Sequence, residues 1–414
     1  MVSKFMNFPG PKKGKGRMVI KRPASLKTQS WKQVPYVRGN RAVPARGVRR
    51  EQAHWRRVVP ELLKASDIDI VKMLIHDKIL PDWSGKRCPK CNRGTLSTLQ
   101  THCNEAKPKY RCSSKACQQR IHPQYLHPLF HAGRGPEALS LQTQSALLLL
   151  VILRVPLASI HLILGVNHKV VEAMHKNLQL VRKKYVVQKE KGIKFGASGK
   201  WSDVEGDEAT FDKRDVLSDA AWEHEVKADR SMLWEQWCGL VQRGKPQTLV
   251  LARLSPTLTA TRSPGPGPIT KQDWGPLGKK WLANRSVIFH TDSAKAYKMK
   301  LPRVLHDSVV HQKKRVKKNG KWEWTKPNFV KMKVHKLPGG KTVKVKCGTQ
   351  HIDRCWKFIK ERLSKGTNVR AGMGRLQAQI RSAQYEYWYR GDDMWVRTGE
   401  LLSAYMSEIV VPAS

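Results

Sequence analysis

The chain has 414 residues, which allows two or three domains, and its 78 Lys and Arg against 32 Asp and Glu give a formal charge of +46. This charge exceeds what solubility needs, so we expect a polyanionic partner, nucleic acid above all. The longest purely apolar segment, residues 146–153, is too short to cross a bilayer, which argues against a membrane protein. No apolar secretion signal follows Met1, so we expect a protein that is not secreted: nuclear in a eukaryotic host and otherwise cytoplasmic.

Residues 1–50 contain no Asp or Glu and carry scattered Lys and Arg. They are predicted to form a basic, disordered arm that follows phosphates without a fold of its own. A targeting segment or a solvated tail is an equally open interpretation. Residues 51–86 are predicted to form a helical lead-in to the first folded module.

Four cysteines in residues 87–131 have the spacing of a zinc ribbon: Cys88, Cys91, Cys112 and Cys117. Two close pairs separated by a short segment are what four thiolates need to reach one tetrahedral ion. The second pair is looser than usual, so His102 and Cys103 are alternative ligands. Unmetallated buried thiols are the alternative to a zinc site. This spacing suggests metal binding rather than disulfide bonds, and it therefore fits a protein in a reducing compartment.

Residues 137–190 carry apolar positions at helical spacing, interrupted by a turn at residues 165–167. A helix, a Gly-containing turn and a second helix resemble a helix-turn-helix module. We expect the second helix to end in Arg182, Lys183 and Lys184 and to offer these cations to DNA phosphates. A helical pair that only packs against the rest of the protein remains the alternative.

A core is predicted at residues 197–370. A strand near residues 200–214 would place Asp203, Glu205 and Asp207 on one face, since alternate residues of a strand point the same way. Such a row of like charges favours a divalent cation between them, unless the strand is merely a solvated edge. A second, apolar strand at residues 287–289 leads to Asp292, and acids at the carboxyl ends of buried strands are typical of α/β sites.

A helix is predicted after residue 350, because Ile352, Trp356, Ile359 and Leu363 form an apolar stripe. Asp353 lies beside this stripe in the first turn. The helix dipole by itself favours a carboxylate there, so capping is the simple explanation of Asp353. Its place in the chain after two other strand-borne acids favours a role in the same site.

The core is predicted to carry a basic hairpin insertion at residues 312–347, with a turn at residues 338–340. Alternation places its lysines on exposed faces, where they would contact DNA phosphates: Lys331, Lys333, Lys344 and Lys346. The opposite face would take Met332, Val334, Val343 and Val345. A solvated lysine face is the alternative. Residues 371–414 are predicted to form a helical tail that packs on the core.

Four motifs follow one another in the chain: a CPKC knuckle that closes in YRC, then VEGDEATF, HTDSAKAY and GTQHIDRCWKFIK. Together they resemble the motifs of the Merlin superfamily of DDE transposases and of its bacterial insertion-sequence relatives. The resemblance covers residues 87–365. It implies an α/β protein with a ribonuclease-H-like core, a mixed sheet with helices, preceded by a zinc ribbon and a small helical DNA-binding module.

The resemblance also implies the site. Asp207, Asp292 and Asp353 would be the catalytic acids that hold Mg²⁺ or Mn²⁺, although the family usually has Glu or Asn at the third position. Supporting motif positions are Glu208, Trp356 and Lys360. The implied activity is cleavage and strand transfer at transposon ends.

The implied partners are double-stranded DNA at both the ends and the target, and a homo-oligomer is compatible with this activity. No small-molecule substrate is expected. Two other interpretations stay open. One is an inactive, transposase-derived DNA-binding or architectural protein, and the other is an RNA-binding ribbon protein.

Overall fold

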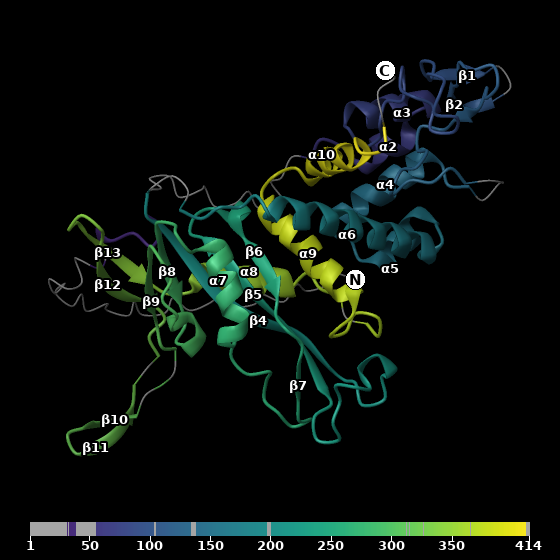
Figure 1. Ribbon diagram of the computed structural model, residues 1–414. Coiled ribbons are helices and arrows are strands. Elements are labelled where there is room, and N and C mark those ends of the chain that lie inside the picture. The colour runs from purple at the N-terminus through teal and green to yellow at the C-terminus, as the bar shows by residue number, and fades with distance from the viewer. Residues whose placement is uncertain are drawn as a thin grey trace, which may run out of the picture. The chain divides into compact units, whose positions relative to one another are not determined.

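The structure is a computed structural model (Figure 1) that describes residues 31, 33–38, 55–102, 105–133, 138–196, 200–311, 313, 315–325, 327–364 and 366–410. Of residues 102, 105, 106 and 318 it describes only the backbone. The arm predicted at residues 1–50 lies outside the described residues apart from 31 and 33–38, as does the alternative ligand Cys103. No helix in the described ranges is long and apolar enough to span a bilayer.

The N-terminal part contains helices and a small sheet. Helices α2 (Val59–Lys64) and α3 (Asp67–His76) fall in the segment where a helical lead-in was expected. Strands β1 (Gln100–His102), β2 (Glu105–Arg111) and β3 (Arg120–Ile121) pair in that order, and the four ribbon cysteines lie around them. Trp83 fills the space beneath this sheet as part of one apolar cluster.

The largest sheet is mixed, and it confirms the predicted α/β architecture. Its strand order is β6-β5-β4-β8-β9, and β7 pairs with the other end of β5. The strands are β4 (Ser202–Asp215), β5 (Met232–Gln242), β6 (Val250–Arg253), β7 (Thr257–Thr259), β8 (Val287–Thr291) and β9 (Val304–Ser308). Strands β4, β5 and β6 pair antiparallel, whereas β8 runs parallel to β4, and β9 runs parallel to β8.

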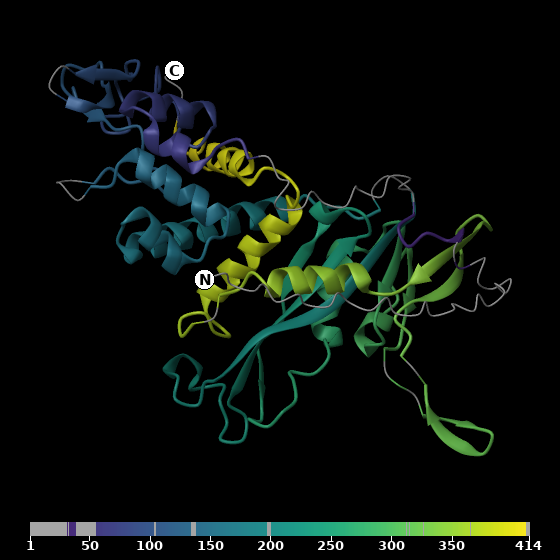
Figure 2. The same cartoon turned by 180° about the vertical axis from the view of Figure 1, so that it is seen from behind.

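Helices cover both faces of this sheet. Helix α7 (Lys271–Trp281) packs on one face, where Trp274 stacks on Phe289 with ring centroids 5.1 Å apart (Figure 1). Helix α8 (Gln350–Lys360) packs on the other, as the yellow-green helix in Figure 2 shows. Its buried side chains are Ile352, Cys355, Trp356 and Ile359. Three of the four residues of the predicted apolar stripe are therefore buried, and Leu363 lies beyond the helix end.

The helical region after the ribbon consists of α4 (Leu141–Ile152), α5 (Leu157–Leu164) and α6 (His168–Glu190). Gly165 takes the left-handed conformation at the end of α5, and the Asn167 side chain caps α6. The prediction that this helix ends at Lys184 is wrong, because it continues to Glu190. Its apolar positions extend to Val186 and pack against α9 (Gly374–Trp388), which precedes α10 (Met394–Met406).

Two separate hairpins follow β9: β10 (Arg315–Lys318) with β11 (Lys321–Trp324), and β12 (Lys331–Lys336) with β13 (Thr342–Cys347). The predicted alternation is wrong in part of the second hairpin. Val334 is exposed and His335 is buried, while Lys346 is half-buried. The chain forms two compact units, one of residues 332–346 with the described residues before 37, and one of residues 37–331 with 347–414.

Close packing of α8 on the sheet depends on Gly239, which pairs with Asp207 in the register of β4 and β5. A Cβ atom at Gly239 would lie 2.5 Å from Cη2 of Trp356 and 3.0 Å from Cδ1 of Ile352. We predict that Gly239→Ala pushes α8 away from the sheet and lowers the free energy of unfolding by about 1 to 3 kcal/mol, as overpacking does. Urea denaturation measures the loss.

The matched control is Gly265→Ala, because a Cβ atom at Gly265 would meet nothing within 4 Å. It should leave the free energy of unfolding within about 0.5 kcal/mol of the wild type, as most surface substitutions do. Equal losses in the two variants would show that α8 does not depend on the absence of a side chain at Gly239.

Candidate functional site

The first acid of the row on β4, Asp203, is balanced by the protein's own cations. Its carboxylate accepts a hydrogen bond from Arg38 Nε at 2.6 Å and lies 3.0 Å from His290 Nε2. The other ring nitrogen of His290 lies 2.7 Å from Asp307 Oδ1. Burial acts to raise the pKa of Asp203, but the hydrogen bonds with His290 and Arg38 lower it below its ordinary value. Asp203 is therefore part of a buried network of charged and polar side chains.

The second acid, Glu205, is fully buried and fixes the start of α8. Its Oε2 accepts hydrogen bonds from the backbone N–H groups of His351 at 2.6 Å and Ile352 at 3.0 Å. Its Oε1 accepts from Arg243 Nε at 2.6 Å, and Arg243 Nη2 donates to the carbonyl oxygen of Gly348 at 2.8 Å. Thr349, the residue at the N-cap position, makes no side-chain capping bond. Glu205 thus caps the helix from a neighbouring strand, as the helix dipole favours.

Asp207, the third acid of the row, has a different environment. Trp356 Nε1 donates a hydrogen bond to its Oδ2 at 3.1 Å. Burial raises the pKa of Asp207 well above its ordinary value. The charges that add to this rise are all negative: those of Glu208, Asp353 and Asp292. The idea that one divalent cation balances the whole acidic row is therefore wrong for Asp203 and Glu205, and for Asp207 it stays a prediction.

Strand register explains why Asp292 lies near Asp207. Glu205 is opposite His290 in the parallel pair of β4 and β8, so two residues further along Asp207 faces Asp292, just past the end of β8. Neighbouring strands are about 4.8 Å apart. One oxygen of Asp292 accepts the backbone N–H of Ala294 at 3.0 Å.

Asp353 comes to the same region from α8, one turn before Trp356, so both side chains lie on the same side of the helix. Partial burial raises its pKa, and a hydrogen bond from Thr349 Oγ1 at 3.3 Å opposes this rise. The charges of Glu205 and Asp292 raise it further. The three predicted acids therefore share one electrostatic environment.

The three acids do not form a closed ligand set. Among the described residues, two groups have three or more ligand atoms all within 4.8 Å of one another, and Asp207, Asp292 and Asp353 are in neither. Aspartate has one methylene fewer than glutamate and reaches less far. A cation held by all three would need inward movement of α8 or a bridging water molecule. Carboxylate oxygens under mutual repulsion nevertheless suit Mg²⁺.

Glu208 lies on the opposite face of β4 and supports the segment after Asp292. It accepts a hydrogen bond from the Tyr297 hydroxyl at 2.5 Å and another from the backbone N–H of Ile269 at 3.2 Å. Tyr297 belongs to a short 3-10 helix, η4 (Lys295–Lys298), that follows Asp292 directly in the chain. The sequence indicated Glu208 only as an acidic neighbour of Asp207. In the structure Glu208 positions η4, the segment that follows Asp292.

A shallow, open groove runs along α8 beside Asp353. Its lining consists of Asp353, Trp356, Lys357, Lys360 and Glu361. Lys357 and Lys360 are exposed, so cations flank the acidic site on the solvent side. Such an arrangement attracts a phosphate group to the edge of the site.

The four ribbon cysteines form a cluster that can hold a metal ion such as zinc. The Sγ atoms of Cys88 and Cys117 are 3.9 Å apart, and those of Cys91 and Cys112 are 3.7 Å apart. A regular tetrahedron with Zn–S bonds of about 2.3 Å has neighbouring sulfurs about 3.8 Å apart. The observed separations therefore fit four thiolates around one ion.

Local backbone supports this cluster. The N–H groups of Gly94 and Arg93 lower the pKa of Cys91 to about 6, whereas burial raises the pKa of Cys112 to about 12. A Cβ atom at Gly94 would lie 2.5 Å from Cys112 Sγ, so the turn needs a glycine there. A thiolate at Cys91 is what metal binding requires.

The second group of potential ligands, His290, Asp307 and Cys347, gave no signal in the sequence. All three residues are buried. Both ring nitrogens of His290 already lie within hydrogen-bonding distance of carboxylates, those of Asp203 and Asp307. Burial opposes a rise in the pKa of His290, but the neighbouring carboxylates raise it. This imidazole therefore joins the carboxylates of Asp203 and Asp307 in one buried network.

The cations predicted to contact DNA fall into two classes. Arg182 is buried and donates hydrogen bonds to Glu386 at 2.8 Å and to Ser382 at 3.2 Å, so its assignment as a surface contact is wrong. Its position inside the longer α6 explains the error. Lys184 pairs with Glu408, and Lys346 Nζ lies 4.5 Å from the ring centroid of Trp31. The other predicted DNA-contacting lysines are exposed or half-buried: Lys183, Lys331, Lys333 and Lys344.

Comparison of the chain with protein-family models, with curated proteins and with solved structures gives no match.

The cysteine geometry predicts that the purified, reduced protein binds about one zinc per chain. Cys88→Ser should abolish this binding, because it removes one of four ligands. Elemental analysis by mass spectrometry, after dialysis against metal-free buffer, measures the content. Cys355→Ala, which changes a buried cysteine of α8, is the control and should keep the zinc. A folded, reduced wild type without zinc would contradict this prediction.

Proposed function

We propose that the protein is a DDE transposase of the Merlin type whose mixed sheet is a ribonuclease-H-like core. Three antiparallel strands, β6, β5 and β4, continue into the parallel strands β8 and β9. The proposed acids come from the middle of this sheet, from the end of the adjacent parallel strand and from the helix that crosses the same face. This order of elements supports the fold that the sequence resemblance implies.

One observation carries the proposal: Asp207 is half-buried on β4, and this burial together with the negative charges of Glu208, Asp353 and Asp292 raises its pKa well above its ordinary value. Bringing like charges together in a partly desolvated place costs folding free energy, so a site of this kind is a candidate for function. Two Mg²⁺ or Mn²⁺ ions held there would activate water or a DNA 3′-hydroxyl and stabilise the leaving oxygen of a phosphodiester.

The chain's own residues would prepare this reaction. Trp356 holds one oxygen of Asp207 by a hydrogen bond, which leaves Oδ1 for a ligand. Thr349 orients Asp353 in the same way. Lys357 and Lys360 in the groove along α8 would hold the phosphates on either side of the scissile bond. The site can thus be approached by a nucleic-acid backbone from the side of the helix.

The rest of the chain would supply affinity for double-stranded DNA. We propose structural zinc in the four-cysteine cluster, and phosphate contacts by the exposed lysines of the β12–β13 hairpin, Lys331, Lys333 and Lys344. A formal charge of +46 supports a polyanionic partner of this kind.

The raised pKa of Asp207 predicts the pH dependence of the Asp207→Asn variant. An acid whose pKa is higher in the folded state stabilises the fold below its unfolded pKa and loses that contribution as the pH rises through its folded pKa. Without added Mg²⁺ or Mn²⁺, the variant should therefore exceed the wild type in free energy of unfolding. This excess in free energy of unfolding should grow with pH. Its full size should be about 1.4 kcal/mol for each unit by which folding raises the pKa of Asp207. Urea denaturation at about pH 5 and about pH 8 measures it.

Glu225→Gln, an exposed carboxylate between β4 and β5, is the control and should show no such margin. Added Mg²⁺ should raise the free energy of unfolding of the wild type and leave that of Asp207→Asn unchanged. The difference in stability between the two proteins should therefore become smaller. If the variant is less stable than the wild type at every pH, like-charge repulsion does not dominate at Asp207.

We also expect Mg²⁺- or Mn²⁺-dependent nicking and strand transfer on a plasmid that carries the sequences flanking the gene. Asp207→Ala and Asp292→Ala should each lower the rate by about 100-fold or more, since each removes a ligand of the proposed ions. Gel electrophoresis of the products over time gives the rates, and Glu225→Gln should keep the activity. Unchanged activity in both alanine variants would refute the site.

Asp353→Glu tests whether the third acid is adapted or degenerate. In an active enzyme fitted to aspartate, the longer side chain should disturb the site and lower the rate. A large gain in cleavage would instead favour an inactive, transposase-derived DNA-binding protein.

A further inference from the structure

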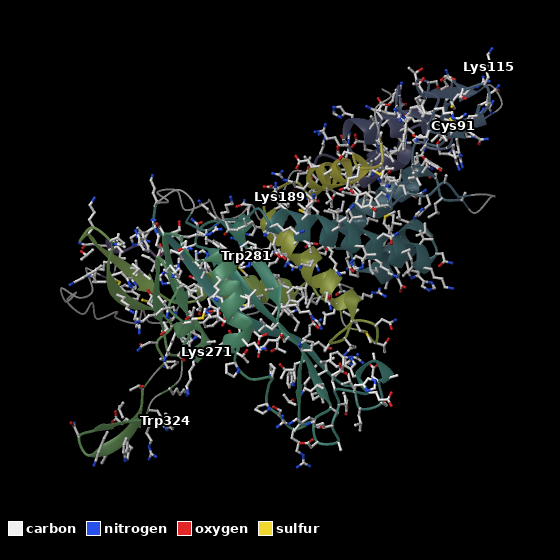
Figure 3. All side chains as sticks on the ribbon, viewed as in Figure 1. Cys91, Lys115, Lys189, Lys271, Trp281 and Trp324 are labelled. Carbon is white, nitrogen blue, oxygen red and sulfur yellow. The ribbon has the colours of Figure 1, made fainter. Side chains whose placement is uncertain are left out.

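The β10–β11 hairpin presents two tryptophan side chains to solvent. Trp322 is 58% exposed and Trp324 is 67% exposed, and both belong to β11. Figure 3 shows Trp324 on this two-stranded ribbon. Indole is among the largest side chains and is usually well buried, so two neighbouring exposed indoles mark a binding surface.

Strand register shows what accompanies the two indoles. Trp324 is opposite Arg315, and Trp322 is opposite Lys317. Residues that face each other in an antiparallel pair lie on the same face of the ribbon, so this face carries two aromatic rings and two cations. The Arg315 guanidinium also lies 5.3 Å from the ring centroid of Trp322. We call these four residues the indole face.

The opposite face of the ribbon has a different character. Val316 is paired with Glu323 there, and Lys318 is paired with Lys321. The indoles and the arginine are therefore concentrated on one side. Asn319 and Gly320 form the connecting turn with positive φ values of 51° and 81°, as a tight two-residue hairpin turn requires. The indole face is thus built before any partner arrives, which lowers the entropy cost of binding.

We propose that the indole face binds unpaired nucleobases of single-stranded DNA. An aromatic ring stacks on any base because every base has a π face, and cations beside the ring neutralise the adjoining phosphates. Alternate side chains of a strand are about 6.8 Å apart, which is twice the rise of about 3.4 Å per nucleotide. Bases two nucleotides apart can therefore stack on the rings of Trp322 and Trp324.

Charge favours this ligand over an apolar protein partner. An apolar protein surface on this face would bury Arg315 and Lys317 without a counterion, which costs free energy. A nucleotide strand supplies the aromatic ring and the counterion together. Duplex DNA supplies phosphates but keeps its bases stacked inside the helix, so it would use the cations and leave the indoles unoccupied.

The test compares binding of the full-length protein to a fluorescein-labelled single strand of mixed sequence, to its duplex, and to the RNA of the same sequence. Fluorescence anisotropy at fixed salt, without added divalent metal, keeps the measurement independent of cleavage. Trp322→Ala with Trp324→Ala should lower affinity for the single strand by about tenfold or more. The same variant should change duplex affinity by less than about threefold, because duplex contacts are phosphate contacts.

Three further variants separate stacking from other effects. Trp322→Phe with Trp324→Phe keeps two rings and should retain most of the affinity. Val316→Ala changes the opposite face and should have no effect. Lys317→Ala should reduce the slope of log affinity against log salt by about 0.7, whereas the double alanine variant should leave that slope unchanged. Equal thermal midpoints would show that all variants are folded.

The proposal is overturned if the double alanine variant, folded, binds the single strand as well as the wild type does. It is also overturned if single strand and duplex lose affinity equally, because the indoles would then only shape the ribbon. A loss confined to the RNA strand would assign the indole face to RNA and would likewise refute binding of single-stranded DNA. None of these outcomes bears on the acids of the proposed cleavage site.

Discussion

The candidate site depends on the buried contact between Glu205 and the first turn of α8. A carboxylate that accepts two backbone N–H groups and pairs with Arg243 restrains the first turn of α8 against sliding along the sheet. Charge-assisted hydrogen bonds between buried groups are strong, and removing one partner would leave the other charged group buried and unpaired. Trp356 then reaches Asp207 and Asp353 faces the same region only because this end of the helix is fixed.

Strand β4 organises the other side of the site as well. Glu208, the residue after Asp207, points to the opposite face and holds the Tyr297 hydroxyl. The 3-10 helix that follows Asp292 is thereby tied to β4. One short segment therefore supplies the central acid and positions the segments that carry the other two. Its alternation decides the roles, since odd-numbered residues face α8 and even-numbered residues face α7.

Sequence patterns predicted the elements better than they predicted the partners of each side chain. Periodicity placed β4, β8 and α8, and cysteine spacing placed the metal cluster, because these signals are local. Period two cannot distinguish Glu205, which caps a helix, from Asp207, which meets other acids, since the partners that differ come from other helices and strands, remote in the sequence. Arg182 was misplaced because polar residues around it hid the continuation of α6. The Asn319-Gly320 dipeptide is a local signal for the β10–β11 hairpin, because both residues adopt the positive φ values of a two-residue turn.

A strongly cationic chain has to keep its acids from being neutralised by its own lysines if they are to hold metal ions. On α8, Lys357 follows Asp353 by four residues, the spacing at which the two would pair. Its Nζ instead lies 3.9 Å from Glu361, while Thr349 donates to Asp353. Asp203 and Glu205, by contrast, are given arginine partners. The row of carboxylates is thus divided into Asp203 and Glu205, whose charges are balanced within the fold, and Asp207, whose neighbours are other acids. That division is the physical reason to assign chemistry to Asp207 rather than to its neighbours along β4.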